Sequence, residues 1–398
     1  MSRFLTGLFL FLAISAAGAS PGYRTAIVSS PDHDCSETLV SAVLTPPAGF
    51  GGVIVRGPSG IVPCQYCPEG NKIRLMWIAG ALGKGQSRAY RVEFAPGSKP
   101  KASQGVQIKR IAGAVTVALD GKPFTTLRFA DGPKPYLYPV IGPTGDPVTR
   151  NYPMREVEGE TRDHPHHRSW WFTFGDVNGV DFWSENGKAG RIVQTRLEVA
   201  DYGPVLGRIR TQNDWVAPDG KIVCRDASEM RFYRVSSGRM ADLDVTIRAT
   251  EGPVTFGDTK EGMMGFRVAS SMDVDRKQGH IVNSRGQKDG DAWGRAAEWC
   301  DYYGPVNGKT VGIAVMDHPS SFRHPTYWHV RTYGLFAANP FGIGDFPEGK
   351  GKDGSYTIPK GGELRFRYRV FIHTGAPDQV GVWRIFDTYA RPPVVTVK

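Results

Sequence analysis

Two long segments of the chain alternate apolar and polar residues with a period of two, and this pattern restricts the fold more than any other feature. In residues 240–249 every second residue is apolar, and in residues 364–370 arginines fill the alternate positions. Because successive side chains of a strand point to opposite faces, each segment predicts a strand with one buried face. Residues 191–199, 205–215 and 224–235 predict further long strands. Antiparallel strands of this length are typical of β-sandwiches.

Turn residues support an all-β protein. The chain has 398 residues, enough for two domains, and its 49 Gly and 29 Pro predict frequent turns. We expect a small N-terminal β domain over 20–100 that ends in a Pro- and Gly-rich linker at 96–101. A large antiparallel β-sandwich, with an architecture similar to the mutarotase-like supersandwich, is expected over 101–398. One C-terminal helix is predicted over 377–390, because it starts at a Pro and has apolar residues at helical spacing.

The first residues of the chain predict export. An apolar run over 4–14 is followed by small residues at 17–19, a pattern typical of a secretory signal peptide over 1–19. No later apolar run has the length needed to span a bilayer. We therefore expect a periplasmic or secreted protein without a membrane span.

The chain has five cysteines, which in an oxidising compartment permit one or two disulfides. Cys35 with Cys64 or Cys67 is the local candidate, and one thiol must stay unpaired. Cys64 and Cys67 are alternatively half of a zinc site or a redox pair. The sequence favours a structural role, since no second Cys pair completes such a site.

The formal net charge of +10 at pH 7 is compatible with an anionic ligand such as an acidic glycan. A cationic surface that keeps the protein soluble is the alternative explanation. Because the basic residues are scattered along predicted strands, we expect no nucleic-acid partner. The oligomeric state is left open.

Two His-rich segments dominate the functional part of the sequence. Residues 162–185 contain His164, His166 and His167, and residues 317–342 contain a second group of histidines, namely His318, His324 and His329. Both groups begin with the triplet Asp-His-Pro, so we expect one shared pocket, lined by Trp170, Trp183 or Trp328. On an extended strand His164 and His166 would face one side and His167 the other.

The His164 and His166 pair suits either two metal ligands or two groups that hydrogen-bond a sugar. A metal would need a third ligand from the second His group. Arg168 would lie on the same face as His166, and a fixed positive charge weakens cation binding but suits a sugar hydroxyl or a uronate carboxylate. We therefore expect no metal and no cofactor. A buried His cluster held by Asp163, Asp176 and Asp317 is the structural alternative.

Residues 257–262 form a second group of interest. Asp258 and Lys260 share a face of an extended strand, whereas Glu261 faces the other side unless Gly262 makes a bulge. In a cleft, Glu261 suits general acid or base catalysis. A surface salt bridge is the simpler alternative.

The aromatic content of these segments indicates a carbohydrate cleft, because Trp and Tyr rings stack on sugar faces while polar groups bind hydroxyls. The predicted catalytic residues are Glu261, Asp176, Asp181 and His164. The predicted substrate-binding residues are His166, His167, Arg168, Trp183, Lys260, His318, His329, Arg331, Tyr333 and Asn339.

A Pro-rich segment precedes the first His group. Its prolines argue against a central strand, so we expect residues 133–153 to form a stiff loop that presents Tyr136, Tyr138, Arg150 and Tyr152 to the pocket. An edge segment over the core is the alternative.

Six short blocks are distinctive as a set, and they lie at residues 138–140, 163–169, 175–183, 257–262, 317–319 and 333–342. The set resembles the signature blocks of the PmoA-like family of exported bacterial proteins, which carries the label methane oxygenase. The resemblance spans about residues 100–375. It implies a secreted protein of a polysaccharide-degrading bacterium.

These observations predict an exported carbohydrate-active enzyme that cleaves a glycosidic linkage in a plant or algal type of glycan, acidic glycans included. One of Glu261, Asp176 and Asp181 would protonate the leaving oxygen, while a second carboxylate or a His acts on water or the anomeric carbon. The alternatives are a sugar epimerase, mutarotase or lyase on the same fold, a His-liganded metal oxygenase, and a glycan-binding protein without catalysis.

Overall fold

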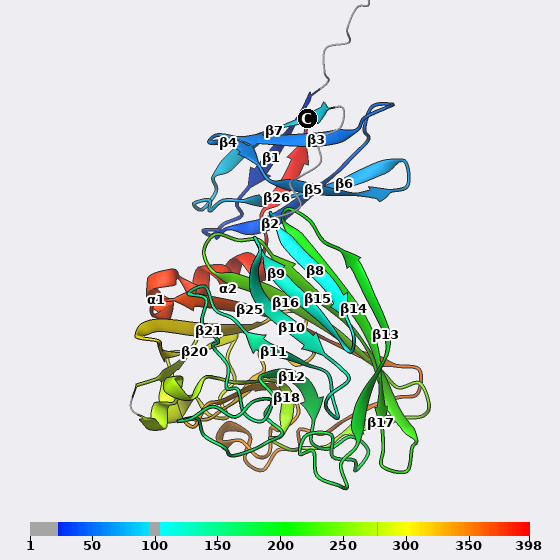
Figure 1. Cartoon of the computed structure of the whole chain (residues 1–398), viewed down its shortest axis with the longest axis vertical. Helices are drawn as coiled ribbons and strands as arrows, with labels where there is room; N and C mark the ends of the chain where they lie inside the picture. Colours follow the sequence, from blue (N-terminus) through cyan, green and yellow to red (C-terminus); the bar gives the residue numbers. More distant parts are fainter. Residues whose placement is uncertain (1–22, 96–103, 277) are drawn as a thin grey trace, which may run out of the picture.

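The computed structural model describes residues 23–95, 104–276 and 278–398, and its elements are mostly antiparallel β-strands (Figure 1). The prediction of an all-β protein with a small β domain, a large β-sandwich and a C-terminal helix is confirmed. The predicted signal peptide and the predicted linker at 96–101 lie outside the described residues.

The N-terminal domain is a small sandwich of two sheets (Figure 1). The five-stranded sheet has the order β26-β1-β7-β3-β4, with β26 (Val394–Val397), β1 (Tyr23–Ser29), β7 (Ser87–Ala95), β3 (Gly52–Gly57) and β4 (Gly60–Val62). The three-stranded sheet contains β2 (Thr38–Leu44), β6 (Lys72–Ala79) and β5 (Cys64–Glu69). Val55, Leu75 and Trp77 are fully buried between them. Because β26 pairs with β1, the last strand of the chain completes this domain. The predicted boundaries had assigned that strand to the large sandwich.

The large sandwich consists of two eight-stranded sheets. The first, here called the site sheet, has the order β22 (Tyr327–Val330), β23 (Leu335–Asn339), β18 (Gly262–Arg267), β12 (Trp170–Phe174), β11 (Tyr136–Val140), β10 (Lys122–Arg128), β9 (Ala114–Leu119) and β8 (Val106–Ile111). The second, the long-strand sheet, has the order β13 (Arg191–Asp201), β14 (Leu206–Val216), β15 (Ile222–Tyr233), β16 (Arg239–Arg248), β25 (Glu363–Thr374), β21 (Lys309–Asp317), β20 (Trp299–Val306) and β19 (His280–Asn283). The long strands predicted from the alternation are therefore confirmed.

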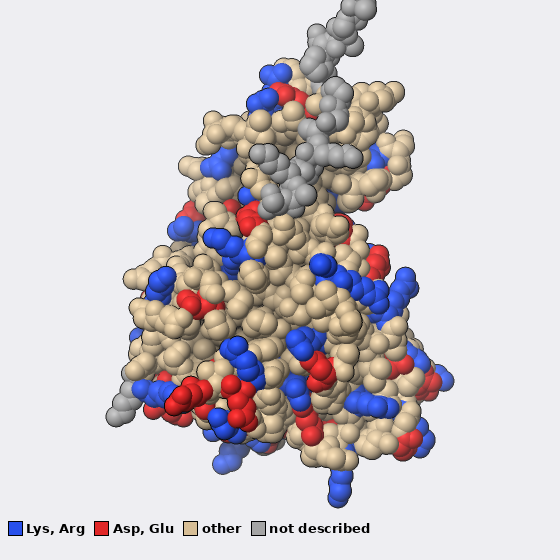
Figure 2. Space-filling view, viewed as in Figure 1, with Lys and Arg blue, Asp and Glu red and all other residues tan. Residues whose placement is uncertain are grey.

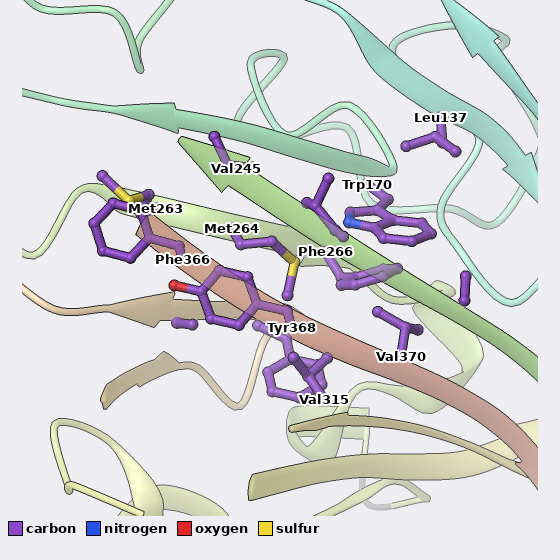
Figure 3. Close-up of a cluster of buried hydrophobic side chains, with 14 of the residues drawn as sticks. Leu137, Trp170, Val245, Met263, Met264, Phe266, Val315, Phe366, Tyr368 and Val370 are labelled. Carbon is purple, nitrogen blue, oxygen red and sulfur yellow. The ribbon is translucent and has the colours of Figure 1, made fainter. Parts of the chain in front are cut away.

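The core lies between these two sheets, where side chains from both interdigitate (Figure 3). Trp170 and Phe266 come from the site sheet, and Val245, Phe366 and Tyr368 come from the long-strand sheet. All five are at most 1% exposed. The alternating positions of β16 and β25 thus place their apolar residues in the core and their charged residues on the opposite face, as the period of two requires.

Shorter elements complete the fold. A two-stranded sheet is formed by β17 (Val254–Phe256) and β24 (Tyr356–Ile358), and four single-turn helices are η1 (Ser270–Met272), η2 (Val274–Arg276), η3 (Asp289–Ala292) and η4 (Pro347–Gly349). The C-terminal helix is divided at Gly381, whose φ of 67° is left-handed, into α1 (Pro377–Val380) and α2 (Val382–Ala390). Ile385 and Tyr389 of α2 pack with Met240 and Phe371 against the long-strand sheet.

Two sequence expectations are corrected by the fold. All five cysteines are free thiols, so no disulfide forms; Cys35, for example, is buried beside the Ser30 hydroxyl and His33. The segment predicted to be a Pro-rich loop contains the interior strand β11. The pairing of β11 with β12 ends at Leu137. Pro139, which has no N–H to donate, therefore lies beyond that pairing. No helix in the described part of the chain is long and apolar enough to cross a membrane.

Candidate functional site

A pocket of about 300 Å³, here called the site pocket, opens on the face of the site sheet that is turned away from the core. Its lining residues come from the first His segment, the loops after β12 and before β18, and the turn before β23, and they are His164, His166, His167, Gly175, Asp176, Asp181, Trp183, Ser184, Thr259, Glu261 and Tyr333. All four residues predicted to be catalytic therefore line one pocket. Four of the ten predicted substrate-binding residues join them, namely His166, His167, Trp183 and Tyr333.

The three histidines reach the pocket through a tight turn, so the prediction of an extended strand is wrong here. The His167 N–H donates to the His164 carbonyl at 3.0 Å, with Pro165 as the second residue of the turn. Pro favours this position because its ring fixes φ. The turn brings His167 to the same side as His164, and their rings stack with centroids 4.8 Å apart.

Aromatic rings continue this stack on both sides. Tyr333 stacks on His164 at 5.2 Å, and Trp171 stacks on His167 at 5.4 Å. Trp183 contacts His166 and His167 with centroids 6.2 and 5.6 Å away. Of the tryptophans expected to line the pocket, only Trp183 does so, because Trp170 and Trp328 point into the core.

Hydrogen bonds fix the protonation of the His167 ring. Its Nδ1 lies 3.2 Å from the Arg267 guanidinium, which has only donors, so Nδ1 must be the unprotonated nitrogen and Nε2 carries the proton. Burial holds the pKa of His167 well below its usual value, and neighbouring cationic groups lower it further.

Of the three pocket histidines, His166 is the one whose ring is free of hydrogen bonds to the described residues. Its ring makes no hydrogen bond to any residue in the described ranges. Burial, followed by the positive charge of Lys134, lowers the pKa of His166 to about 4. The ring is therefore neutral at pH 7 and offers one donor and one acceptor.

An ionic network that contains two buried arginines holds the His turn. The Asp163 carboxylate pairs with Arg150, with Arg267 at 2.8 Å and with His164 Nδ1 at 2.9 Å. Both guanidinium side chains are almost completely buried. Burial alone would raise the pKa of Asp163, but Arg267, His164 and Arg150 outweigh it and lower the pKa to about 2. The sequence analysis did not include Arg267 among the site residues.

Asp273 belongs to the same network, but its pKa is raised, whereas that of Asp163 is lowered. Burial raises its pKa to about 7, although Arg267 and Arg276 oppose the shift. Its Oδ1 has no hydrogen-bond partner among the described residues.

The raised pKa of Asp273 predicts a pH-dependent stability. A carboxyl whose folded pKa is raised stabilises the fold in its protonated form, and this contribution is lost as the pH rises from about 4 through about 7. We expect Asp273→Asn to increase the free energy of unfolding by about 2 kcal/mol at pH 8 and to change it little at pH 4. Urea unfolding at both pH values measures the difference. An equal effect at both values would contradict the assignment.

The three pocket carboxylates differ in how far the fold uses them. Asp181 is fully engaged, because it accepts the N–H groups of Trp183 and Ser184 and the Ser184 hydroxyl. Asp176 accepts the Gly179 N–H at 2.8 Å through one oxygen. Among the described residues, the Glu261 carboxylate has Lys260 Nζ at 3.4 Å as its one ionic partner, and about a third of its side chain is exposed. Glu261 is therefore the carboxylate most available for chemistry.

Hydrogen bonds fix the loop that carries Glu261. Asn339 is fully buried, donates to the Thr259 carbonyl at 2.9 Å and accepts the N–H groups of Phe341 and Gly342. It therefore orders the loop and does not line the site pocket. Asp258 accepts the Gly344 and Gly354 N–H groups and does not pair with Lys260, which the strand pattern had suggested.

Arg168 belongs to a second buried ion group and does not line the site pocket. Arg168 Nε donates to both Glu185 oxygens at 2.8 and 2.9 Å, and Glu185 also pairs with the buried Lys134. Burial lowers the pKa of Lys134 to about 8, and Glu185 opposes the shift. Arg168 and His166 line different pockets, so the expectation that they act together on one ligand group is not met in the site pocket.

The histidines of the second His segment do not line the pocket, although Tyr333 of that segment does, and this corrects the prediction that histidines of both segments share one pocket. His318 lies beside Arg367 of β25 and the Tyr389 ring of α2. The buried His329 accepts a hydrogen bond from Trp293 Nε1 at 3.0 Å. Arg331 lies over the Trp293 and Tyr333 rings, so it is next to the pocket without lining it.

The donor set does not fit a metal ion. Among the described residues no group of three His, Cys, Asp or Glu side chains is arranged to hold one. His164 Nδ1 is bound to Asp163, and His167 Nδ1 faces the Arg267 guanidinium. A fixed guanidinium beside a divalent cation weakens its binding.

Sequence comparison places the chain in a family. A family model described as "Family of unknown function (DUF6807)" matches residues 114–387. The chain belongs to this family. The DUF6807 region begins in β9 and ends in α2, so it contains every residue of the site pocket. No curated protein sequence matches the chain.

Solved structures similar to this DUF6807 chain include an α-mannosidase from Enterococcus faecalis V583, at 10% identity and a TM-score of 0.43. That similarity covers 94% of this chain and 46% of the mannosidase, so the chain spans about half the length of that protein. A galactose mutarotase-like protein from Lactobacillus casei ATCC 334 is 10% identical, with a TM-score of 0.31, and the similarity covers 68% of this chain and 100% of that protein.

Proposed function

We propose that this DUF6807 protein is a carbohydrate-active enzyme that hydrolyses a glycosidic linkage in the site pocket. The observation that carries the proposal is the position of Glu261. Its carboxylate is little used by the fold and lines a pocket together with the neutral His166 and the Trp183 and Tyr333 rings. A sugar ring needs both kinds of surface, because it has apolar C–H faces and a polar rim.

Glu261 is the proposed general acid and base. In its protonated form it donates the proton to the leaving glycosidic oxygen, and the C–O bond to the anomeric carbon breaks. Water supplies a hydroxyl to the anomeric carbon, and its remaining proton goes to a carboxylate. Asp176 is the second carboxylate of the pair, because one of its oxygens is free of the hydrogen bond from Gly179. Asp181 serves as a turn cap in this scheme.

The histidines position the sugar. His166 offers a donor and an acceptor to hydroxyl groups, since its neutral ring has no partner in the described part of the protein. The stacked His164 and Tyr333 rings form one wall of the site pocket. The buried network of Arg150, Asp163 and Arg267 keeps this wall in place.

Elimination and epimerisation would use the same acid and base, so their products separate them from hydrolysis. Hydrolysis adds one water across the two products, a lyase forms an unsaturated sugar, and an epimerase leaves the mass unchanged. A glycan-binding protein without catalysis would give no product. Export to the periplasm or beyond, and membership of the PmoA-like family, stay predictions.

Chelation separates the sugar enzyme from a His-liganded oxygenase. We expect that dialysis against EDTA leaves the activity unchanged, because the pocket histidines are held by Asp163 and Arg267 and not arranged around a metal. His166→Ala should weaken substrate use by about tenfold, since it removes a hydrogen-bonding partner of the sugar. Activity that disappears on chelation and returns with one specific metal would contradict the proposal.

A further inference from the structure

A second pocket of about 520 Å³ opens beside the site pocket and is lined by three arginines, Arg128, Arg155 and Arg168. Asp131 is the one carboxylate among its lining residues. We call it the arginine pocket. Its charge differs from that of the site pocket, which is lined by three carboxylates and no Lys or Arg among the described residues.

The two pockets are neighbours on the same face of the site sheet. Tyr136 and Tyr138 of the arginine pocket belong to one packed aromatic cluster with Trp183 and Tyr333 of the site pocket. Glu185 also connects them, because it pairs with Arg168 and with Lys134, whose Nζ donates to the Trp183 carbonyl at 3.3 Å. The two pockets are therefore joined by packed and ion-paired residues.

Two of the arginines keep unused hydrogen-bond donors. Arg168 binds Glu185 through Nε, and its two terminal nitrogens have no partner among the described residues. Arg155 has no ion pair to any carboxylate in the described ranges, and its guanidinium donates there only to the Asn151 side-chain oxygen, at 3.3 Å. The same Asn151 oxygen accepts the Tyr138 hydroxyl at 2.8 Å, which holds Arg155 beside the aromatic wall.

The arginine pocket differs from a charged groove of about 420 Å³ on the long-strand sheet. There Arg210 pairs with Glu229 at 2.7 Å, Arg231 pairs with Asp244 at 2.9 Å, and Arg365 pairs with Asp244 at 3.2 Å. On the face seen in Figure 2 basic and acidic side chains also lie close together in most places. The arginine pocket differs in its balance of charges, because Asp131 is its one lining carboxylate whereas Glu198, Glu229, Asp244 and Glu363 line the groove on the long-strand sheet.

Resting on the proposed function of the site pocket, we propose that the arginine pocket is a subsite for a sugar that carries an anionic group, so that the substrate is an acidic oligosaccharide. A guanidinium group binds a carboxylate or sulfate through two parallel N–H donors. The Tyr138 ring and Pro139 supply the apolar contact for the ring of that sugar. The anion is a uronate carboxylate or a sulfate ester, and the probes distinguish the two.

Calorimetric titration tests the subsite with tetrasaccharides of galacturonate, of a sulfated galactan and of a neutral galactan. We expect wild-type protein to bind at least one acidic tetrasaccharide about tenfold or more tightly than the neutral one, with an affinity that falls as salt is added. Arg155→Gln should remove most of this preference and leave binding of the neutral tetrasaccharide unchanged. The matched control is Arg110→Gln, an exposed arginine on the distant edge strand β8, which should keep the preference.

The outcomes separate the subsite from the proposed function. Equal binding of acidic and neutral tetrasaccharides, or the same loss in Arg155→Gln and Arg110→Gln, overturns the subsite while leaving Glu261 chemistry intact. If Glu261→Gln leaves turnover unchanged while Arg155→Gln still abolishes the acidic preference, the subsite stands and the proposed catalytic role fails.

Discussion

Glu261→Gln is expected to lower turnover by about two orders of magnitude or more while leaving the affinity for the oligosaccharide nearly unchanged. Gln has the size of Glu but does not exchange a proton, and removing a general acid or base has an effect of this scale. In the part of the chain that the structure describes, the Glu261 carboxylate pairs with Lys260 alone, at 3.4 Å, so the loss of its charge should not affect folding. Turnover assays and calorimetric binding on the same preparation measure the two quantities.

Two comparisons sharpen this test. Glu158→Gln, at an exposed position outside the site pocket, should keep full turnover. Asp181→Asn should mainly disturb the turn that Asp181 caps, with lower stability as the first symptom. Full activity in Glu261→Gln, combined with a strong loss in Asp176→Asn, would show that the acid and base is Asp176.

Asp163→Asn is expected to lower the free energy of unfolding by about 3 kcal/mol at pH 7. The change leaves two almost completely buried guanidinium groups, Arg150 and Arg267, without their shared counter-charge, and an uncompensated buried charge has a cost of this size. Urea unfolding at constant temperature measures the change. Asp32→Asn, which removes the exposed pair with Arg391, is the matched control and should change the midpoint little.

The stability contributed by Asp163 also has a defined pH window. Because its pKa is lowered to about 2 in the folded protein, the contribution is present above about pH 4 and is lost as the pH falls through about 2. Asp163→Asn should therefore differ most from the wild type above pH 4. A destabilisation that is the same at pH 3 and pH 7 would contradict the role of the ionised carboxylate.

The architecture could be predicted from local periodicity, because apolar and polar residues alternate along a strand that has one buried face. The alternating residues of β16 and β25 predicted the long-strand sheet for this reason. Strand β11 was missed since a proline in a run argues against an interior strand, and the sequence does not reveal that its pairing with β12 ends before Pro139. The return of β26 to the N-terminal domain is a long-range pairing that no local pattern encodes.

The candidate site was predicted in part. The density of His, Trp and carboxylate residues between His164 and Glu185 identified one side of the pocket. The repeated Asp-His-Pro triplet was misleading, because each copy encodes a local turn. His167 N–H bonds the His164 carbonyl, and Ser321 N–H bonds the His318 carbonyl at 2.8 Å in the same way. A repeated turn motif does not imply a shared pocket.

The sequence also does not distinguish a catalytic polar residue from a polar residue that stabilises a turn. Asn339 and Asp181 looked like site residues, yet each satisfies backbone N–H groups of a turn. Lys134 and Arg267 were missed because a single basic residue gives no pattern, although both are buried beside the His turn. Pro165 was the available signal for that turn, since Pro favours its second position.

The most direct test of the central claim is the mass balance of the products formed from a panel of acidic and neutral oligosaccharides. Purified protein and the Glu261→Gln variant are incubated with each oligosaccharide, and the products are identified by mass spectrometry. We expect the wild type to convert an acidic oligosaccharide into two shorter products whose masses together equal the substrate plus one water, and the variant to do so far more slowly. Products that lack the added water, or no product from any oligosaccharide in the panel, would contradict it.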